Sequence, residues 1–409
     1  MSGFDTPDRG TRVDERLDKF LAAHEEELIA FRRQLHAHPE LSWEEHETTA
    51  LLSSRLAVAD LDPRPLETDT GLVLDLGDPA AGPTVALRAD IDALPLDDEK
   101  DVPYRSTVAG VCHACGHDVH TAILLGATLA LADLLADLEP AGRVRLLFQP
   151  AEEAMPGGAD FLATTSVMDD VDVIYALHCD PSLDVGKVGM RVGPITAAAD
   201  RIMIRLHGPG GHTARPHLTA DLVHIAGRII CDLPAGFTKL TDMRDAPTLV
   251  FGMAQSGHAP NVIPSTALLG ATLRSQGRTT WDEAPALVER LLASIVEPFG
   301  AEYEVDYVRG SPPTDNDERA TEVFAEGARR ALGADAVVPT GQSVGNEDFS
   351  WFLERAPGSY ARLGVRPMGS TRRLDLHAST FDVDEAAIGL GVRLLTHTAL
   401  RALDAYGDA

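Results

Sequence analysis

Residue types that bind metal ions recur at the ends of strand-like and helix-like runs along this 409-residue chain. Scattered blocks can serve one centre only if the fold brings them together. An α/β layer fold does so, because sites in such folds gather at the carboxyl ends of strands. The blocks are residues 113–118, 149–153, 176–180 and 375–378, with two further carboxylates in residues 87–92.

Strand-like and helix-like segments alternate on both sides of a central region. Strands, each followed by acidic residues or a histidine, are expected at residues 84–89, 144–148 and 171–177. Ser42 and Glu45 form a capping-box pattern that predicts a helix start. Further helices are expected at residues 13–35, 120–138, 318–332, 348–354 and 384–405. The alternation predicts an α/β domain with a mixed central sheet flanked by helices.

The central region has a different pattern. Strand-like segments 201–206, 248–254, 267–273 and 302–308 are interleaved with helix-like segments 220–233 and 281–296. We therefore expect an inserted α+β domain at residues 195–309, while residues 1–194 and 310–409 form the catalytic domain. Cys231 lies in an apolar run within the insert and is expected to be a core residue.

Charge and composition narrow the class of protein. Acidic residues outnumber basic ones by 63 to 35, giving a formal charge of -28, so no nucleic-acid partner is expected. No apolar run reaches the ~18 residues that span a membrane, and the first residues lack the pattern of a signal peptide. Four cysteines are too few for a disulfide scaffold. A cytoplasmic location is the expectation.

Cys115 and His117 flank Gly116, which permits a tight backbone, so both side chains can reach one small volume. Thiolate and imidazole suit zinc, and imidazole with carboxylates also suits manganese. Cys112 and Cys115 form a C-x-x-C, which keeps a zinc-ribbon or redox alternative open. The chain has no second pair at ribbon spacing, and the motif enters a helix from a loop, unlike a thioredoxin-like setting.

Two adjacent carboxylates, Glu152 and Glu153, follow the strand expected at residues 144–148. Adjacent side chains point in different directions, so one can bind a metal ion while the other faces a substrate. This division suits metal-assisted hydrolysis, in which one carboxylate fixes the metal and the other takes a proton from the activated water.

A series of motifs in a fixed order runs along the whole chain. They are FRRQLHAHPELS (residues 31–42), RADIDALP (88–95), HACGHDVH (113–120), FQPAEE (148–153), GGHTARPH (210–217), NVIP (261–264), NEDF (346–349) and LH (376–377). In order and spacing the motifs resemble those of the two-metal amidohydrolases of the aminoacylase and carboxypeptidase superfamily. The resemblance is strongest to the branch of hippurate hydrolase and the indole-acetyl-amino-acid hydrolases.

The resemblance implies a centre of two divalent ions per chain, Mn²⁺ or Zn²⁺. Cys115 would lie between the two ions, at a position that an aspartate occupies in other branches. The remaining metal ligands would be His117, Glu153, His178 and His377.

The resemblance also implies roles in the reaction. Glu152 would be the general base and then the acid, and Asp90 would orient one of the metal ligands. His212 would stabilise the oxyanion and reach the active site of a partner subunit. Asn261 and Arg274 would hold the substrate carboxylate, which an arginine can bind with two parallel hydrogen bonds. The insert would be a ferredoxin-like lid that forms a homodimer.

The predicted function is hydrolysis of the amide bond of a small-molecule N-acyl amino acid. A dipeptidase or carboxypeptidase-type metallopeptidase is the first alternative, and it needs a site for a free α-amino group. A non-catalytic metal or redox sensor is the second, and it has no need of Glu152, His212 and Arg274 together. Cys112 departs from the usual pattern of the branch, and a second thiol beside Cys115 would make the enzyme sensitive to oxidation. Residues 154–156 also depart from this pattern, and their loop is expected to border the substrate, so the acyl preference is not implied.

Overall fold

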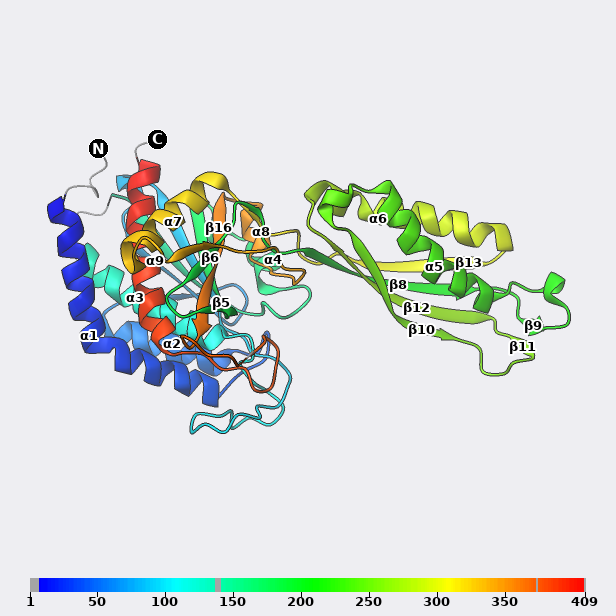
Figure 1. Cartoon of the computed structure of the whole chain (residues 1–409), viewed down its shortest axis with the longest axis horizontal. Helices are drawn as coiled ribbons and strands as arrows, with labels where there is room; N and C mark the ends of the chain where they lie inside the picture. Colours follow the sequence, from blue (N-terminus) through cyan, green and yellow to red (C-terminus); the bar gives the residue numbers. More distant parts are fainter. Residues whose placement is uncertain (1–6, 137–140, 373, 408–409) are drawn as a thin grey trace. The chain divides into compact units, whose positions relative to one another are not determined.

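The computed structural model describes residues 7–136, 141–372 and 374–407 (Figure 1). The chain forms two compact units. Unit 1 comprises Met1–Gly193, Asp315–Gly341 and Asp348–Ala409, and unit 2 comprises Pro194–Thr314 and Gln342–Glu347. The short segment Gln342–Glu347 belongs to unit 2 although its neighbours on both sides in the sequence belong to unit 1.

An eight-stranded mixed sheet forms the centre of unit 1 (Figure 1). Its order is β1 (Arg64–Pro65), β2 (Leu72–Gly77), β4 (Arg143–Gln149), β3 (Thr84–Asp90), β5 (Val173–Asp184), β16 (Gly358–Arg366), β6 (Val188–Met190) and β15 (Val337–Pro339). Strands β4, β3, β5 and β16 are parallel, whereas β2 pairs antiparallel with β4 and β6 with β16. The expected mixed central sheet is confirmed.

Helices flank this sheet. They are α1 (Pro7–Ala37), α2 (His46–Val58), α3 (His117–Leu135), α4 (Gly158–Leu162), α7 (Glu318–Leu332), α8 (Ser350–Leu353) and α9 (Ala386–Gly407). Helices α3, α7 and α9 pack on the strands, and α1 packs on α3 and α9. Their apolar side chains join those of the sheet in one core, which includes Phe31, Leu124, Phe148 and Leu395.

Helix α3 is long and apolar enough to cross a membrane by composition alone, but 78% of its apolar window is buried inside the structure. It is therefore the central core helix of unit 1. The helix begins at His117, three residues before the expected start at His120, and its expected end at Leu138 lies outside the described residues.

Two local predictions in unit 1 were wrong. Helix α2 begins at His46, because Ser42 Oγ donates a hydrogen bond to Asp92 Oδ2 (2.7 Å) and does not cap the helix. Strand β5 does not end before His178 but continues to Asp184, because β16 pairs with it as far as Arg366 opposite Asp184. Pairing partners distant in sequence thus decided both boundaries.

Unit 2 has the β-α-β-β-α-β order of a ferredoxin-like fold. Its elements are β8 (Ala198–His207), α5 (Leu222–Leu240), β10 (Thr248–Ser256), β12 (Thr266–Ser275), α6 (Arg278–Val296) and β13 (Glu302–Val308). The strands form an antiparallel sheet in the order β10-β12-β8-β13, and α5 and α6 pack on it. Short strands β9 (Gly211–His212) and β11 (Val262–Ile263) pair beside it, while β7 (Gly193–Pro194) and β14 (Asp315–Asn316) lie where the chain passes between the units.

The prediction that Cys231 is a core residue was wrong. Ile229 and Leu233 are fully buried on one face of α5, whereas Cys231 is exposed. Residues four apart share a helix face, and the residue midway between them points to the other side. An apolar run in the sequence therefore concealed the amphipathic character of α5.

Candidate metal centre

Polar residues at the ends of the central strands of unit 1 meet at one edge of its sheet. Asp90, the last residue of β3, pairs with Gln149, the last residue of β4. Strand β5 is the parallel neighbour of β3 on the other side, with Ala176 opposite Arg88 and His178 two residues further on. Since parallel strands share their carboxyl edge, the segments that follow β3 and β4 lie near His178.

Cys115 and His117 reach this edge from the start of α3. Gly116 between them has a φ of +91°, and a Cβ at this position would lie 2.9 Å from Cys179 Sγ. Glycine is therefore required both by the backbone conformation and by the space available. The tight turn brings Cys115 Sγ to 3.3 Å from His178 Nε2.

Among several overlapping groups of candidate ligand atoms, two share one thiol and together contain five side chains. In each group the ligand atoms lie within 4.8 Å of one another. One group contains Cys115, His117 and His178, and the other contains Cys115, Glu153 and His377. The structure thus brings together the five residues that the sequence singled out as ligands, with Cys115 common to both groups.

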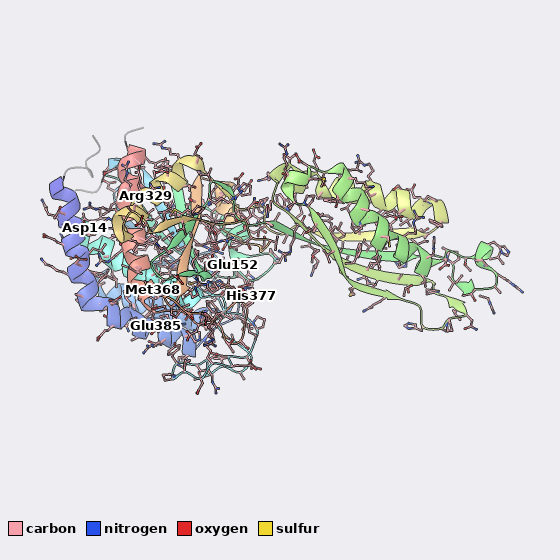
Figure 2. The ribbon with its side chains drawn as sticks, viewed as in Figure 1. Asp14, Glu152, Arg329, Met368, His377 and Glu385 are labelled. Carbon is pink, nitrogen blue, oxygen red and sulfur yellow. The ribbon has the colours of Figure 1, made fainter. Side chains whose placement is uncertain are left out.

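His377 comes from a loop rather than from a strand. Its backbone has a φ of +61°, and its N–H donates a hydrogen bond to Ala114 O (2.8 Å), which holds the loop beside Cys115. Its Nε2 lies 3.2 Å from Glu153 Oε1. His377 is about half exposed, and Figure 2 labels it together with Glu152.

The donor set fits a divalent ion. Thiolate, imidazole and carboxylate are ligands for borderline metals such as zinc. His117 Nε2 is buried and has no hydrogen-bond partner within the described parts of the chain. Its other ring nitrogen is already held, so this nitrogen is left facing the centre, as a metal ligand requires.

The electrostatics of the site point the same way. Burial raises the pKa of the Cys115 thiol, and the carboxylates of Glu153 and Glu152 raise it further. Burial lowers the pKa of His117, but Asp90 and Asp92 outweigh it and raise that pKa to about 10. The neighbouring carboxylates contribute to both shifts, and a bound cation would offset this negative charge.

Asp92 is a site residue that the sequence reasoning missed. His117 Nδ1 lies 2.9 Å from Asp92 O and 3.1 Å from its Oδ1. Asp92 Oδ2 accepts hydrogen bonds from Glu153 N (2.9 Å) and from Ser42 Oγ (2.7 Å). One carboxylate thus fixes the ring of His117 and the backbone of Glu153. The sequence signal was the Asp-x-Asp pattern at the end of β3. A role was predicted for Asp90, its first aspartate, but not for Asp92.

Asp90 contacts a different histidine. Its Oδ1 lies 2.6 Å from His120 Nδ1, and its Oδ2 accepts from Arg88 Nη1 (2.8 Å). His120 Nε2 in turn accepts from Cys179 N (2.8 Å), next to His178. The nearest approach of Asp90 to His117 Nε2 is 3.8 Å. Asp90 therefore holds the ring of His120, and a role in orienting a metal ligand stays a prediction.

The C-x-x-C cysteines do not form a disulfide, and all four cysteines of the chain are free. Cys112 is fully buried, and its Sγ lies 3.7 Å from Lys100 Nζ. Cys115 instead faces His178. The two thiols thus have different surroundings, which does not favour a redox pair.

The predicted substrate residues belong to unit 2. His212 on β9 pairs in register with Val262, the neighbour of Asn261, and both His212 and Asn261 are exposed. Arg274 lies near the end of β12, where it pairs with Ala199 and donates a hydrogen bond to Val344 O. Unit 2 thus places His212 and Asn261 side by side, and the roles of all three toward a substrate stay predictions.

Comparisons with known proteins agree with this geometry. The model of the family described as Peptidase family M20/M25/M40 matches residues 86–401. N-acetyl-L-cysteine deacetylase of Bacillus subtilis is 36% identical over 389 residues, which cover 95% of this chain and 91% of that protein. N-acyl-L-amino acid amidohydrolase of Geobacillus stearothermophilus is 37% identical over 302 residues, which cover 74% of this chain and 81% of that protein.

A longer Rhodococcus jostii protein, whose name is that of a glutamate–cysteine ligase, is 43% identical over 388 residues. The match covers 95% of this chain but only 48% of that protein, so the chain spans about half of its length. Among solved structures, the Bacillus subtilis protein YxeP, described as a dinuclear metal binding peptidase from the M20 family, has a TM-score of 0.80 at 31% identity. The superposition covers 93% of this chain and 99% of that chain.

Proposed function

The chain belongs to the peptidase family M20/M25/M40, and from this premise we propose that it hydrolyses the amide bond of N-acyl amino acids. The observation that carries the proposal is the position of Cys115, common to two groups of ligand atoms beside the Glu152 carboxylate. The two groups support two divalent ions per chain, as does the similarity to a dinuclear peptidase. The names of the deacetylase and amidohydrolase relatives support the substrate class.

Within this proposal, Cys115, His117, Glu153, His178 and His377 hold the ions, with Mn²⁺ and Zn²⁺ as the candidates. When bound, such ions supply Lewis acidity to the scissile carbonyl and to the attacking water. Thiolate and imidazole suit Zn²⁺, and imidazole with carboxylate also suits Mn²⁺.

Glu152 moves the proton. It takes a proton from the attacking water and delivers it to the leaving amine. Its Oε2 lies 3.9 Å from His117 Nε2, and its side chain is only 9% exposed, so little solvent competes for that proton. Glu153 N is held by Asp92 Oδ2, which fixes the turn that presents Glu152.

We also propose roles for three residues of unit 2. His212 stabilises the oxyanion, and Asn261 and Arg274 hold the substrate carboxylate. In a homodimer formed through unit 2, His212 would serve the site of the partner subunit. If so, mixing His212→Ala protein with Glu152→Gln protein under subunit exchange restores activity above either parent. The homodimer and a cytoplasmic location stay predictions from the sequence.

A substrate panel tests the proposal. Protein reconstituted with Mn²⁺ or with Zn²⁺ is assayed against N-acetyl and N-benzoyl amino acids and against dipeptides with the same carboxyl-terminal residue. We expect turnover of the acylated compounds, its loss on chelation and its return with the metal. A preference for dipeptides would favour the metallopeptidase alternative. Turnover that survives complete removal of metal would contradict the proposal.

A further inference from the structure

One buried carboxylate, that of Glu45, connects the start of α2 to the turn that carries Glu152. We infer that Glu45 is a positioning residue, which holds the backbone of this turn so that Glu152 faces the reacting groups. The inference rests on the proposed function in one respect, the role of Glu152 as the base.

The side chain of Glu45 is fully buried, and its hydrogen bonds lead away from its own helix. Oε1 accepts from Ala151 N (2.8 Å) and Trp43 N (3.1 Å), and Oε2 accepts from Thr70 Oγ1 (2.8 Å). Glu45 stands directly before α2, yet its side chain makes no capping hydrogen bond to that helix. Two of its three partners, Ala151 and Thr70, are therefore distant in the sequence, and the third, Trp43, also lies outside α2.

Ala151 needs to be held. Its φ is +54°, a conformation that residues other than glycine seldom adopt and that persists only where the surroundings impose it. Its N–H donates to Glu45 Oε1, and its carbonyl accepts from Gly158 N (2.8 Å). Ala151 is fully buried, so both of its backbone groups depend on these protein partners. Loss of Glu45 would free the residue that directly precedes Glu152.

Glu152 is thus fixed between two anchored amides. On one side Glu45 binds Ala151 N, and on the other Asp92 binds Glu153 N (2.9 Å). Burial and then the nearby Asp92 carboxylate raise the pKa of Glu45 to about 7. Burial thus disfavours the charged form of Glu45, and the hydrogen bonds from Thr70 and Ala151 offset part of that cost.

Glu40 is a matched control in the same segment. Its carboxylate also accepts two backbone N–H groups, from Glu47 (2.9 Å) and Thr48 (2.7 Å), at the start of α2. These contacts stabilise the start of α2, and neither of them is made to the turn that carries Glu152. Glu40→Ala therefore removes a comparable set of hydrogen bonds without the connection to Ala151.

The test compares Glu45→Ala, Glu45→Gln and Glu40→Ala in metal-loaded protein. In Glu45→Gln the amide oxygen can still accept from Ala151 N, and the amide nitrogen can donate to the Thr70 hydroxyl. We expect Glu45→Ala to lower kcat ~10–100-fold with KM and metal content nearly unchanged, because small displacements of a catalytic group have effects of this size. Glu45→Gln should retain most of kcat, and Glu40→Ala should lower Tm but not kcat.

Hydrogen exchange gives a readout that does not need substrate. Amides of residues 148–158 should exchange faster in Glu45→Ala, whereas Glu40→Ala should affect only the start of α2. Failure of the native protein to cleave N-acyl amino acids would count against the proposed function. Hydrogen exchange of residues 148–158 would still test whether Glu45 holds Ala151. If Glu45→Ala does not fold, Thr70→Val removes only the contact to Oε2 and should lower kcat in the same direction.

Two results would overturn the inference. One is native kcat and native exchange of residues 148–158 in Glu45→Ala. The other is an equal fall of kcat in Glu40→Ala and Glu45→Ala at equal loss of Tm, which would make Glu45 a merely structural residue.

Discussion

Replacement of Asp92 by alanine should weaken metal binding. The loss of affinity should exceed that of a variant with a similar loss of stability. The carboxylate makes three side-chain contacts, with Ser42 Oγ at 2.7 Å, Glu153 N at 2.9 Å and His117 Nδ1 at 3.1 Å. Loss of a partner that orients a ligand costs ~10–100-fold in metal affinity. At ~1.4 kcal/mol per tenfold, this is ~1.4–2.8 kcal/mol of binding free energy. The Asp92 carbonyl still contacts His117 Nδ1 at 2.9 Å, which favours the lower end.

The assay is chelator competition, in which the metal affinities of native and Asp92→Ala protein are compared at one pH. Asp75→Ala is the control, because Asp75 is a carboxylate of the same sheet that pairs with the buried Arg145 at 2.8 Å. Its contacts within the described residues are to arginines and not to a candidate ligand. Asp75→Ala should lower Tm and leave metal affinity unchanged. Native affinity in Asp92→Ala, or an equal loss in the control, would refute the reasoning.

Three further predictions concern residues with distinct roles. Glu152→Gln should keep its metal and lose ~10²–10⁴-fold in kcat, whereas Glu153→Gln should lose metal, as metal analysis and kinetics can show. Arg274→Ala should weaken the binding of substrates with a free carboxylate and change little for analogues in which that carboxylate is amidated. KM values for matched pairs of substrates would show this difference. Burial lowers the pKa of His36, but Asp118 and Asp98 raise it to about 10. The stabilisation from its charged form is complete below the unfolded pKa of 6.5 and is lost as the pH rises through about 10, so the Tm deficit of His36→Gln should shrink from pH 6 to pH 10.

The sequence predicted those features that depend on short-range pattern. The buried strands that end in Asp90 and Gln149 predicted that ligands gather at the carboxyl edge of the sheet. The direction of a strand determines at which edge the side chains that follow it lie. Gly116, between Cys115 and His117, likewise predicted the tight turn. In the structure Gly116 has a φ of +91°. The β-α-β-β-α-β order of unit 2 followed from the strand-like and helix-like periodicities of one continuous segment.

Contacts between distant segments were beyond such reasoning. Ser42 satisfies a capping pattern, yet its hydroxyl binds Asp92, 50 residues away. Glu45 is indistinguishable in sequence from a helix-start acid, and only the fold shows that it holds Ala151. Asp90 and Asp92 are the same residue type, and only the fold shows that Asp90 contacts His120 while Asp92 contacts His117.

Metal analysis of protein purified without chelators tests most directly whether this edge of the sheet is a two-ion centre. The two groups of ligand atoms that share Cys115 predict two divalent ions in the native chain. Cys115→Ala should lose metal and activity, because it removes the ligand common to both groups. Cys112→Ala, which alters a buried thiol outside both groups, should retain metal and activity. Metal-free native protein with full activity, or a full metal complement in Cys115→Ala, would contradict the two-ion centre.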